Sequence, residues 1–148
     1  MTLRATLMAA VVSLLAVAAP LAAEHEVKML NSGETGRMVF EPAVLEIAVG
    51  DTVTFLATDP GHNVEYIKDA FPEGAEMVKS KLGETITVTF DVPGIYAYKC
   101  APHLGMGMVG MIVVGEDSAN LEQVTAVTGK LPGKPKGLFA EWLAELAE

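Results

Sequence analysis

The chain of 148 residues has little cysteine, few basic side chains and few long apolar segments. Its single cysteine, Cys100, has no second cysteine with which to form an intramolecular disulfide. Lys and Arg number 10 against 19 Asp and Glu, which gives a net charge of −9. No nucleic-acid partner is expected, because binding nucleic acid depends on basic side chains that neutralise phosphates.

Long apolar runs are confined to the N-terminus. A basic start that includes Arg4 is followed by an apolar run from 7 to 19 and by small residues up to Ala23. This order is typical of a removable export signal, and the run is shorter than the roughly 20 apolar residues of a membrane span. We therefore expect residues 1–23 to be cleaved and the remainder to be a soluble periplasmic protein without a membrane anchor.

A lone cysteine in an exported protein has three explanations: a buried inert thiol, a reactive thiol or a metal ligand. An oxidising compartment disfavours an idle exposed thiol. The compartment therefore favours a metal ligand over a reactive group.

Short segments with alternating apolar residues predict β-strands through most of the chain. The predicted strands are 26–30, 38–40, 44–49, 52–58, 85–90, 95–100 and 109–115. The turn at Gly50 and Asp51 predicts that 44–49 and 52–58 form a hairpin. Seven or eight short strands at even spacing indicate an all-β sandwich or barrel over residues 24–115.

The pattern changes in two places. Residues 67–82 are rich in charge and turn residues and are interpreted as a surface excursion with one helical turn near 75–78. Residues 116–148 predict two helices, over 120–127 and 138–146, the second amphipathic. We expect this C-terminal helical extension to pack on the sandwich.

The densest chemistry lies between Tyr98 and Met111. This stretch contains Cys100, His103 and three of the eight methionines. Thiolate, imidazole and thioether are soft ligands that suit copper better than magnesium or calcium. The spacing Cys100-x2-His103-x4-Met108 supplies three of the four ligands of a His₂Cys-plus-axial-Met copper site, and His62, after a Pro-Gly turn, is the best candidate for the fourth.

Each of these residues taken alone has a simpler structural explanation. A lone buried cysteine is commonly a core residue, a histidine after a turn is commonly a loop residue, and methionines commonly fill gaps in the core. The combination of spacing, export signal and all-β pattern favours the metal site. His25 remains outside this set and is expected to be solvated.

At these residues the sequence closely resembles the pseudoazurins, a group within the cupredoxins. The resemblance rests on the motifs Gly61-His62-Asn63-Val64, Cys100-x-Pro102-His103-x4-Met108, Met38-Val39-Phe40-Glu41-Pro42 and Pro72-Glu73-Gly74-Ala75, and on the two C-terminal helices. It implies an eight-stranded Greek-key sandwich and one type 1 copper ion. His62, Cys100 and His103 would be equatorial ligands, with Met108 axial in preference to Met106 or Met111. Asn63 would tie the two ligand loops together.

The resemblance also implies a function, a one-electron carrier that donates to copper nitrite reductase or a similar periplasmic acceptor. The lysines Lys68, Lys79, Lys81 and Lys99 are candidates to steer the partner toward an electron port at His103. A copper chaperone or store is the alternative. A Cys-His hydrolase is disfavoured, because no third orienting residue accompanies Cys100 and His103, so no enzyme is expected. No oligomer interface is visible, and we expect a monomer.

Overall fold

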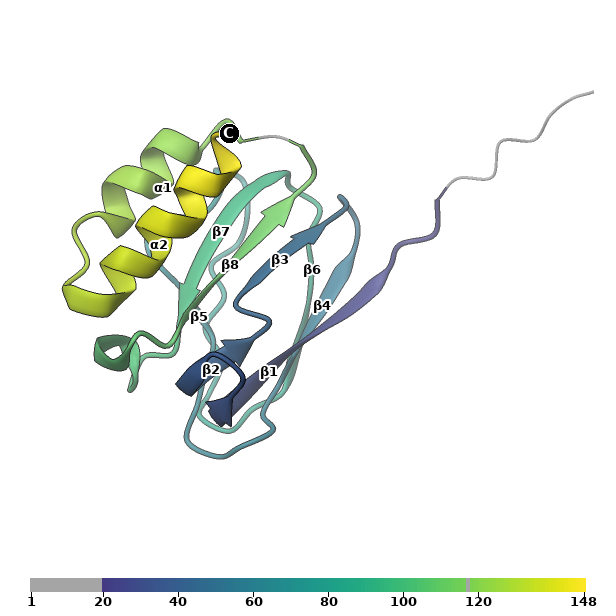
Figure 1. Ribbon diagram of the computed structural model, residues 1–148. Helices are drawn as coiled ribbons and strands as arrows, with labels where there is room; N and C mark the ends of the chain where they lie inside the picture. The colour runs from purple at the N-terminus through teal and green to yellow at the C-terminus, as the bar shows by residue number, and fades with distance from the viewer. Residues whose placement is uncertain (1–19, 117) are drawn as a thin grey trace, which may run out of the picture.

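The computed structural model describes residues 20–116 and 118–148. In this part the chain forms eight β-strands, one 3₁₀ helix and two α-helices (Figure 1). The elements are β1 Glu24–Gly33, β2 Gly36–Glu41, β3 Val44–Ile47, β4 Thr52–Leu56, β5 Glu65–Tyr66, β6 Ile86–Thr89, β7 Gly94–Lys99, η1 Leu104–Met106, β8 Val109–Val114, α1 Leu121–Thr128 and α2 Gly133–Leu146. The predicted export signal lies outside the described residues except for 20–23. No described helix is both long and apolar enough to span a membrane.

The strands form two four-stranded sheets, in the orders β2-β1-β4-β6 and β3-β8-β7-β5. The predicted all-β sandwich with two C-terminal helices is confirmed. The predicted hairpin at Gly50 and Asp51 is wrong: β3 pairs in parallel with β8, whereas β4 pairs in parallel with β1 in the other sheet. The tight turn therefore carries the chain from one sheet to the other.

The central strands β7 and β8 are buried at every position except Lys99. Successive side chains of a strand point to opposite faces. Tyr96, Tyr98 and Cys100 accordingly lie in the cluster between the sheets, whereas Ile95 and Ala97 lie in a second cluster under the helices. This alternation places the Cys100 thiol inside the sandwich.

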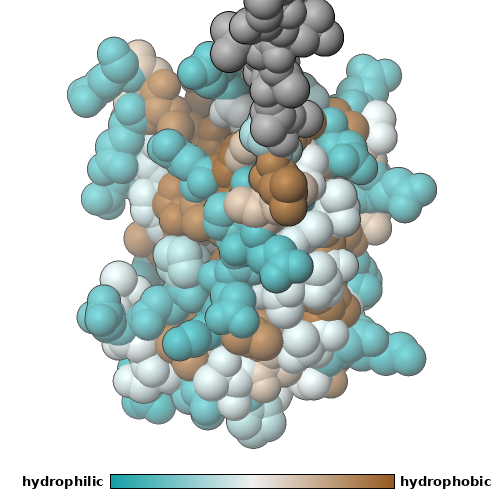
Figure 2. Space-filling view, turned by 90° about the vertical axis from the view of Figure 1, so that its right-hand side faces the viewer, coloured by the Kyte–Doolittle hydropathy of each residue, from teal (hydrophilic) through white to brown (hydrophobic). Residues whose placement is uncertain are grey.

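Helices α1 and α2 cover the outer face of the sheet that contains β7 and β8 (Figure 1). The predicted apolar stripe of the last helix is confirmed, with Phe139 and Leu143 buried and Trp142 packed beside them. Burial of each such side chain contributes roughly 1.5–3 kcal/mol. On the side away from the helices, hydrophilic and hydrophobic residues are interspersed (Figure 2).

The predicted surface excursion at 67–82 is only partly correct. Ile67 and Ala70 are buried, because Ile67 N–H donates to the Ala97 carbonyl and Ala97 N–H donates to the Ala70 carbonyl. The predicted helical turn at 75–78 is wrong. This segment is a bend at Ala75 followed by residues without regular secondary structure, and the Val78 carbonyl accepts from Tyr66 N–H (2.9 Å).

Candidate metal centre

The segment from Cys100 to Met108 forms a tight loop between β7 and β8. Cys100 N–H donates to the Met108 carbonyl (2.9 Å), and Met108 N–H donates to the His103 carbonyl (3.2 Å). Gly107 closes η1 with φ of 86°, a left-handed conformation that glycine adopts without a Cβ clash. These bonds bring Cys100, His103 and Met108 to the same end of the sandwich.

His62 reaches the loop from the segment between β4 and β5. It follows Gly61, another glycine with positive φ, and its carbonyl accepts from Gly83 N–H (2.8 Å). Its Nδ1 atom lies 3.1 Å from His103 Nδ1, and Cys100 Sγ lies 3.7 Å from His62 Nδ1 and 3.5 Å from His103 Nδ1. The three ligand atoms therefore converge on one point, and His62 and Cys100 are 0 % exposed.

The three methionines near this point are separated by packing. Met108 is fully buried in the same core cluster as Cys100. Met111 is buried in the other cluster, on the helix side of β8, and Met106 is 46 % exposed. Burial on the Cys100 side favours Met108 over its two competitors as an axial ligand.

One residue of this site was missed by sequence reasoning. Asn31, in β1, accepts a hydrogen bond at Oδ1 from Nε2 of His62 (2.8 Å). Because an amide oxygen only accepts, His62 carries its proton on Nε2 and turns the lone pair of Nδ1 toward Cys100. The main-chain N–H of Asn31 in turn donates to Asp59 Oδ2 (2.7 Å). A polar amide directly after the predicted strand 26–30 was the available signal.

Asn63 ties the two ligand-bearing segments together, as the resemblance implied. Its Oδ1 accepts from Ala101 N–H (2.8 Å), and its Nδ2 donates to the Ser80 carbonyl (3.3 Å). Asn63 is 4 % exposed, so both bonds are shielded from water. The relative position of His62 and Cys100 is thereby fixed by the protein itself.

Burial makes the site favour uncharged groups. It raises the pKa of the Cys100 thiol, and the main-chain N–H groups of Asn63 and His103 offset this only in part. Burial, and then the neighbouring His103, lower the pKa of His62. A cation among one thiol, two imidazoles and a thioether would reverse the preference at Cys100 and stabilise the thiolate. This soft donor set fits copper.

His25 lies apart from the converging ligand atoms, and its predicted solvation is only partly correct, because its side chain is 26% exposed. Its Nε2 lies 2.8 Å from Asp51 Oδ2 in an ion pair when protonated, and Asp51 also accepts from the N–H groups of Ala23 and Ala48. The bond from His25, followed by that from Ala23, lowers the pKa of Asp51. We refer to Asp51 and these three partners as the Asp51 cluster.

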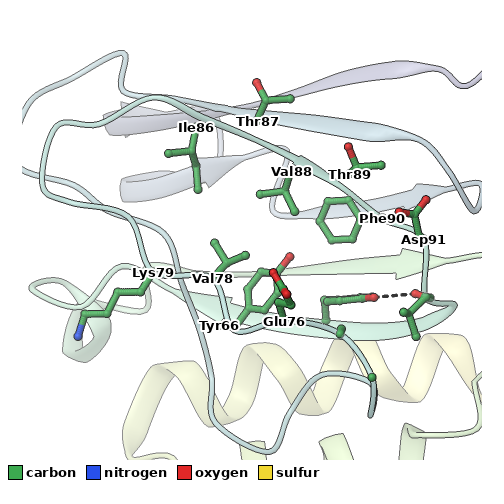
Figure 3. Close-up of a pocket in the computed structure, with 14 residues that line it drawn as sticks. Tyr66, Glu76, Val78, Lys79, Ile86, Thr87, Val88, Thr89, Phe90 and Asp91 are labelled. Carbon is green, nitrogen blue, oxygen red and sulfur yellow. Dashed lines mark hydrogen bonds between the residues drawn. The ribbon is translucent and has the colours of Figure 1, made fainter.

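A pocket of about 600 Å³ opens between β6 and the segment that carries Glu76, Val78 and Lys79 (Figure 3). Its wall includes Tyr66, whose buried hydroxyl has no hydrogen-bond partner among the residues that the structure describes, and burial raises the pKa of Tyr66. None of the four candidate ligands lines this pocket. The converging ligand atoms therefore do not open onto it.

Comparison with known proteins agrees with this geometry. The model of the copper-binding plastocyanin/azurin family matches residues 27–115. Pseudoazurin of Paracoccus pantotrophus is 50% identical over 142 residues, which cover 95% of this chain and 97% of the relative.

Solved structures show the same similarity. The structure of pseudoazurin from Methylobacterium extorquens AM1 has a TM-score of 0.79 at 45% identity, with coverage of 83% of this chain and 98% of the other. That of pseudoazurin from Hyphomicrobium denitrificans has a TM-score of 0.75 at 37% identity, with coverage of 82% and 97%. Copper is accordingly the cofactor, and the chain is an electron-transfer protein rather than an enzyme. The chain belongs to the copper-binding plastocyanin/azurin family, and within it to the pseudoazurins.

Proposed function

We propose that one type 1 copper ion is held by His62, Cys100 and His103 as equatorial ligands and by Met108 as the axial ligand. The convergence of two Nδ1 atoms and one Sγ atom, all within 4.8 Å of one another, carries this proposal. A thiolate, two imidazoles and a weak thioether tolerate both Cu(I) and Cu(II). Copper supplies the one-electron redox chemistry, and the protein supplies fixed ligand positions.

Burial favours an electron carrier over a copper chaperone or store. Cys100, His62 and Met108 are 0 % exposed, so transfer of the ion itself to a partner would require the loop to open. His103 is half-buried, and its Nδ1 faces inward toward Cys100. The opposite edge of its ring therefore reaches the surface, where an electron can pass to a docked partner.

We further propose that this exported monomer works in the periplasm and donates to copper nitrite reductase or a similar acceptor. The predicted export signal supports the location, and the pseudoazurin resemblance supports the acceptor. Lys79 and Lys99 both lie near Glu65, at 3.4 and 3.5 Å, so part of their charge is neutralised locally. This leaves Lys68 and Lys81 as the stronger candidates for steering a partner.

Absorption spectroscopy tests the proposed site. The purified mature protein should take up one Cu(II) per chain, develop intense visible thiolate-to-copper absorption, and bleach reversibly on reduction. Binding of Cu(I) without any coloured Cu(II) form would instead support the chaperone or store.

The acceptor is tested by electron-transfer rates with purified copper nitrite reductase at several ionic strengths. Fast transfer that slows with added salt supports steering by lysines, since salt screens surface charges beyond about 10 Å at 0.1 M. No transfer to this acceptor at any ionic strength would overturn the proposed partner while leaving the copper site intact.

A further inference from the structure

The ligand loop is contacted from outside by the first turn of α2. Glycine at position 107 leaves room for the side chain of Lys134: a Cβ on Gly107 would lie 2.7, 2.9 and 3.1 Å from Cδ, Cγ and Cε of Lys134. The aliphatic stem of the lysine therefore lies directly on the main chain of the loop. Long basic side chains commonly cover apolar or backbone surface in this way while the charged end stays in water.

The covered residue immediately precedes the proposed axial ligand. Gly107 N–H donates to the Leu104 carbonyl (2.9 Å), and the Gly107 carbonyl accepts from Val109 N–H (2.9 Å). The first bond fixes the residue before Met108, and the second joins the residues on either side of it. A displacement of Gly107 would consequently move Met108 relative to Cys100, whose N–H bonds to the Met108 carbonyl.

A cavity of about 170 Å³ adjoins the ligand loop on this side and is lined by Gly107, Lys134, Leu138, Trp142 and Phe40 among others. Lys134 makes no ion pair within residues 20–116 and 118–148 that would fix it elsewhere. The stem of Lys134 thus lies against Gly107 where both residues border this cavity.

We propose that Lys134 is a positioning residue, whose aliphatic stem holds Gly107 and thereby sets the position of Met108 at the copper ion. This role rests on the proposed assignment of Met108 as axial ligand. It connects the C-terminal helices to the electronic properties of the site, and it depends on the stem of Lys134 and not on its charge.

Three variants distinguish the effect of the aliphatic stem of Lys134 from the effect of its charge and from nonspecific effects of a substitution in α2. Lys134→Ala removes both stem and charge, and Lys134→Met removes the charge while keeping an unbranched apolar stem. Lys136→Ala removes a neighbouring exposed lysine of α2 and serves as the matched control. Both positions are solvent-exposed, so the variants should fold, which circular dichroism verifies.

The first measurement is amide hydrogen exchange by NMR in the copper-free protein. Lys134→Ala should speed exchange of the Gly107 and Met108 amides by about tenfold, which corresponds to about 1.4 kcal/mol of local stability. Lys134→Met and Lys136→Ala should leave these amides unchanged. Equal protection in Lys134→Ala, or equal loss in Lys134→Met, would overturn the proposal.

The second measurement is the ratio of the two visible charge-transfer bands in the copper-loaded protein, which reports on the axial interaction. The ratio should change in Lys134→Ala and stay at the wild-type value in the other two variants. A change in all three would show an effect of charge and contradict the positioning role. Failure of the wild-type protein to form a coloured Cu(II) site would overturn the proposed function, while the exchange experiment would still decide whether the stem supports the loop.

Discussion

Two polar clusters of this sandwich, the converging ligand atoms and the Asp51 cluster, differ in which atoms face each other. In the Asp51 cluster, the carboxylate of Asp51 faces a separate donor from each of its three partners. At the other cluster, His62, Cys100 and His103 point their ligand atoms at one another. In the Asp51 cluster the negative charge of the carboxylate is stabilised by hydrogen-bond donors of the protein. At the proposed metal site the lone pairs of the ligand atoms surround a point where a cation fits.

The pKa shifts express the same difference. Hydrogen bonds lower the pKa of Asp51 and keep it charged. Burial raises the pKa of Cys100 and lowers that of His62, so both prefer the neutral form until a metal ion is present. A histidine thus forms a structural ion pair where it faces a carboxylate, as His25 does, and is a candidate metal ligand where it faces a thiol and another imidazole, as His62 does.

Removal of the thiol should have the largest effect on this contrast. Cys100→Ser should abolish the intense visible absorption of the Cu(II) protein completely, because the band requires a thiolate ligand. Asp51→Asn should leave the absorption unchanged. Visible spectra of both variants at equal copper loading provide the test, and a coloured Cys100→Ser protein would contradict the ligand role of Cys100.

Removal of the bond that orients His62 should have the next largest effect. Asn31→Leu deletes the acceptor for His62 Nε2 and should weaken copper affinity about 10–100-fold, the usual cost of losing a partner that orients a metal ligand. Asn31→Asp keeps an acceptor at the same position and should retain most of the affinity. Competition titration with a copper chelator measures both, and equal affinities in the wild-type and Asn31→Leu proteins would show that Asn31 does not orient the ligand.

The site residues that could be predicted from the sequence, and the one that could not, differ in how local their contacts are. Cys100, His103 and Met108 lie in one loop, so their spacing and soft chemistry alone indicate a metal site. Asn31 meets His62 because β1 pairs in parallel with β4, across 31 residues of chain. Amino-acid pattern alone does not specify such a pairing.

The errors in the predicted fold have the same origin. A turn at Gly50 and Asp51 is compatible with a hairpin or with a crossing between sheets. The chain crosses because β3 pairs with β8 and β4 pairs with β1, and neither pairing can be inferred from the residues of the turn. A helical turn was predicted near 75–78, but the Val78 carbonyl instead accepts from the Tyr66 N–H of β5. Tertiary pairing overrode local propensity in both places.

Exchange of the axial ligand should have a moderate effect. Met108→Gln should retain the visible absorption and lower the reduction potential by on the order of 60 mV, a tenfold change in preference between the two oxidation states. Met106→Gln, at an exposed position of the same loop, is the matched control and should leave the potential unchanged. Voltammetry of both proteins checks this, and a shift in Met106→Gln alone would reassign the axial ligand.

The Asp51 cluster should show the smallest effect, confined to acid stability. Because the pKa of Asp51 in the folded protein lies below its ordinary value of 3.8, the unfolded chain takes up the proton first as the pH falls. The stability that Asp51 contributes is fully present above about pH 3.8 and is lost as the pH falls through the lowered pKa. Asp51→Asn should lack this dependence.

Urea unfolding of the copper-free wild-type and Asp51→Asn proteins between pH 7 and pH 3 measures this difference. The two unfolding curves should be separated most at neutral pH and should approach each other below about pH 3.8. A separation that grows with acid would contradict the sign of the pKa shift.

Crystal structures of the copper-loaded protein in both oxidation states test most directly whether His62, Cys100, His103 and Met108 hold one redox-active copper ion in a preformed cluster. We expect a single copper ion bound by the two Nδ1 atoms and the Cys100 sulfur, with the Met108 sulfur as a weaker ligand. The ligand positions should be nearly identical before and after reduction. A copper ion bound at exposed Met106 or at His25, or a loop that rearranges between the two states, would contradict a preformed site.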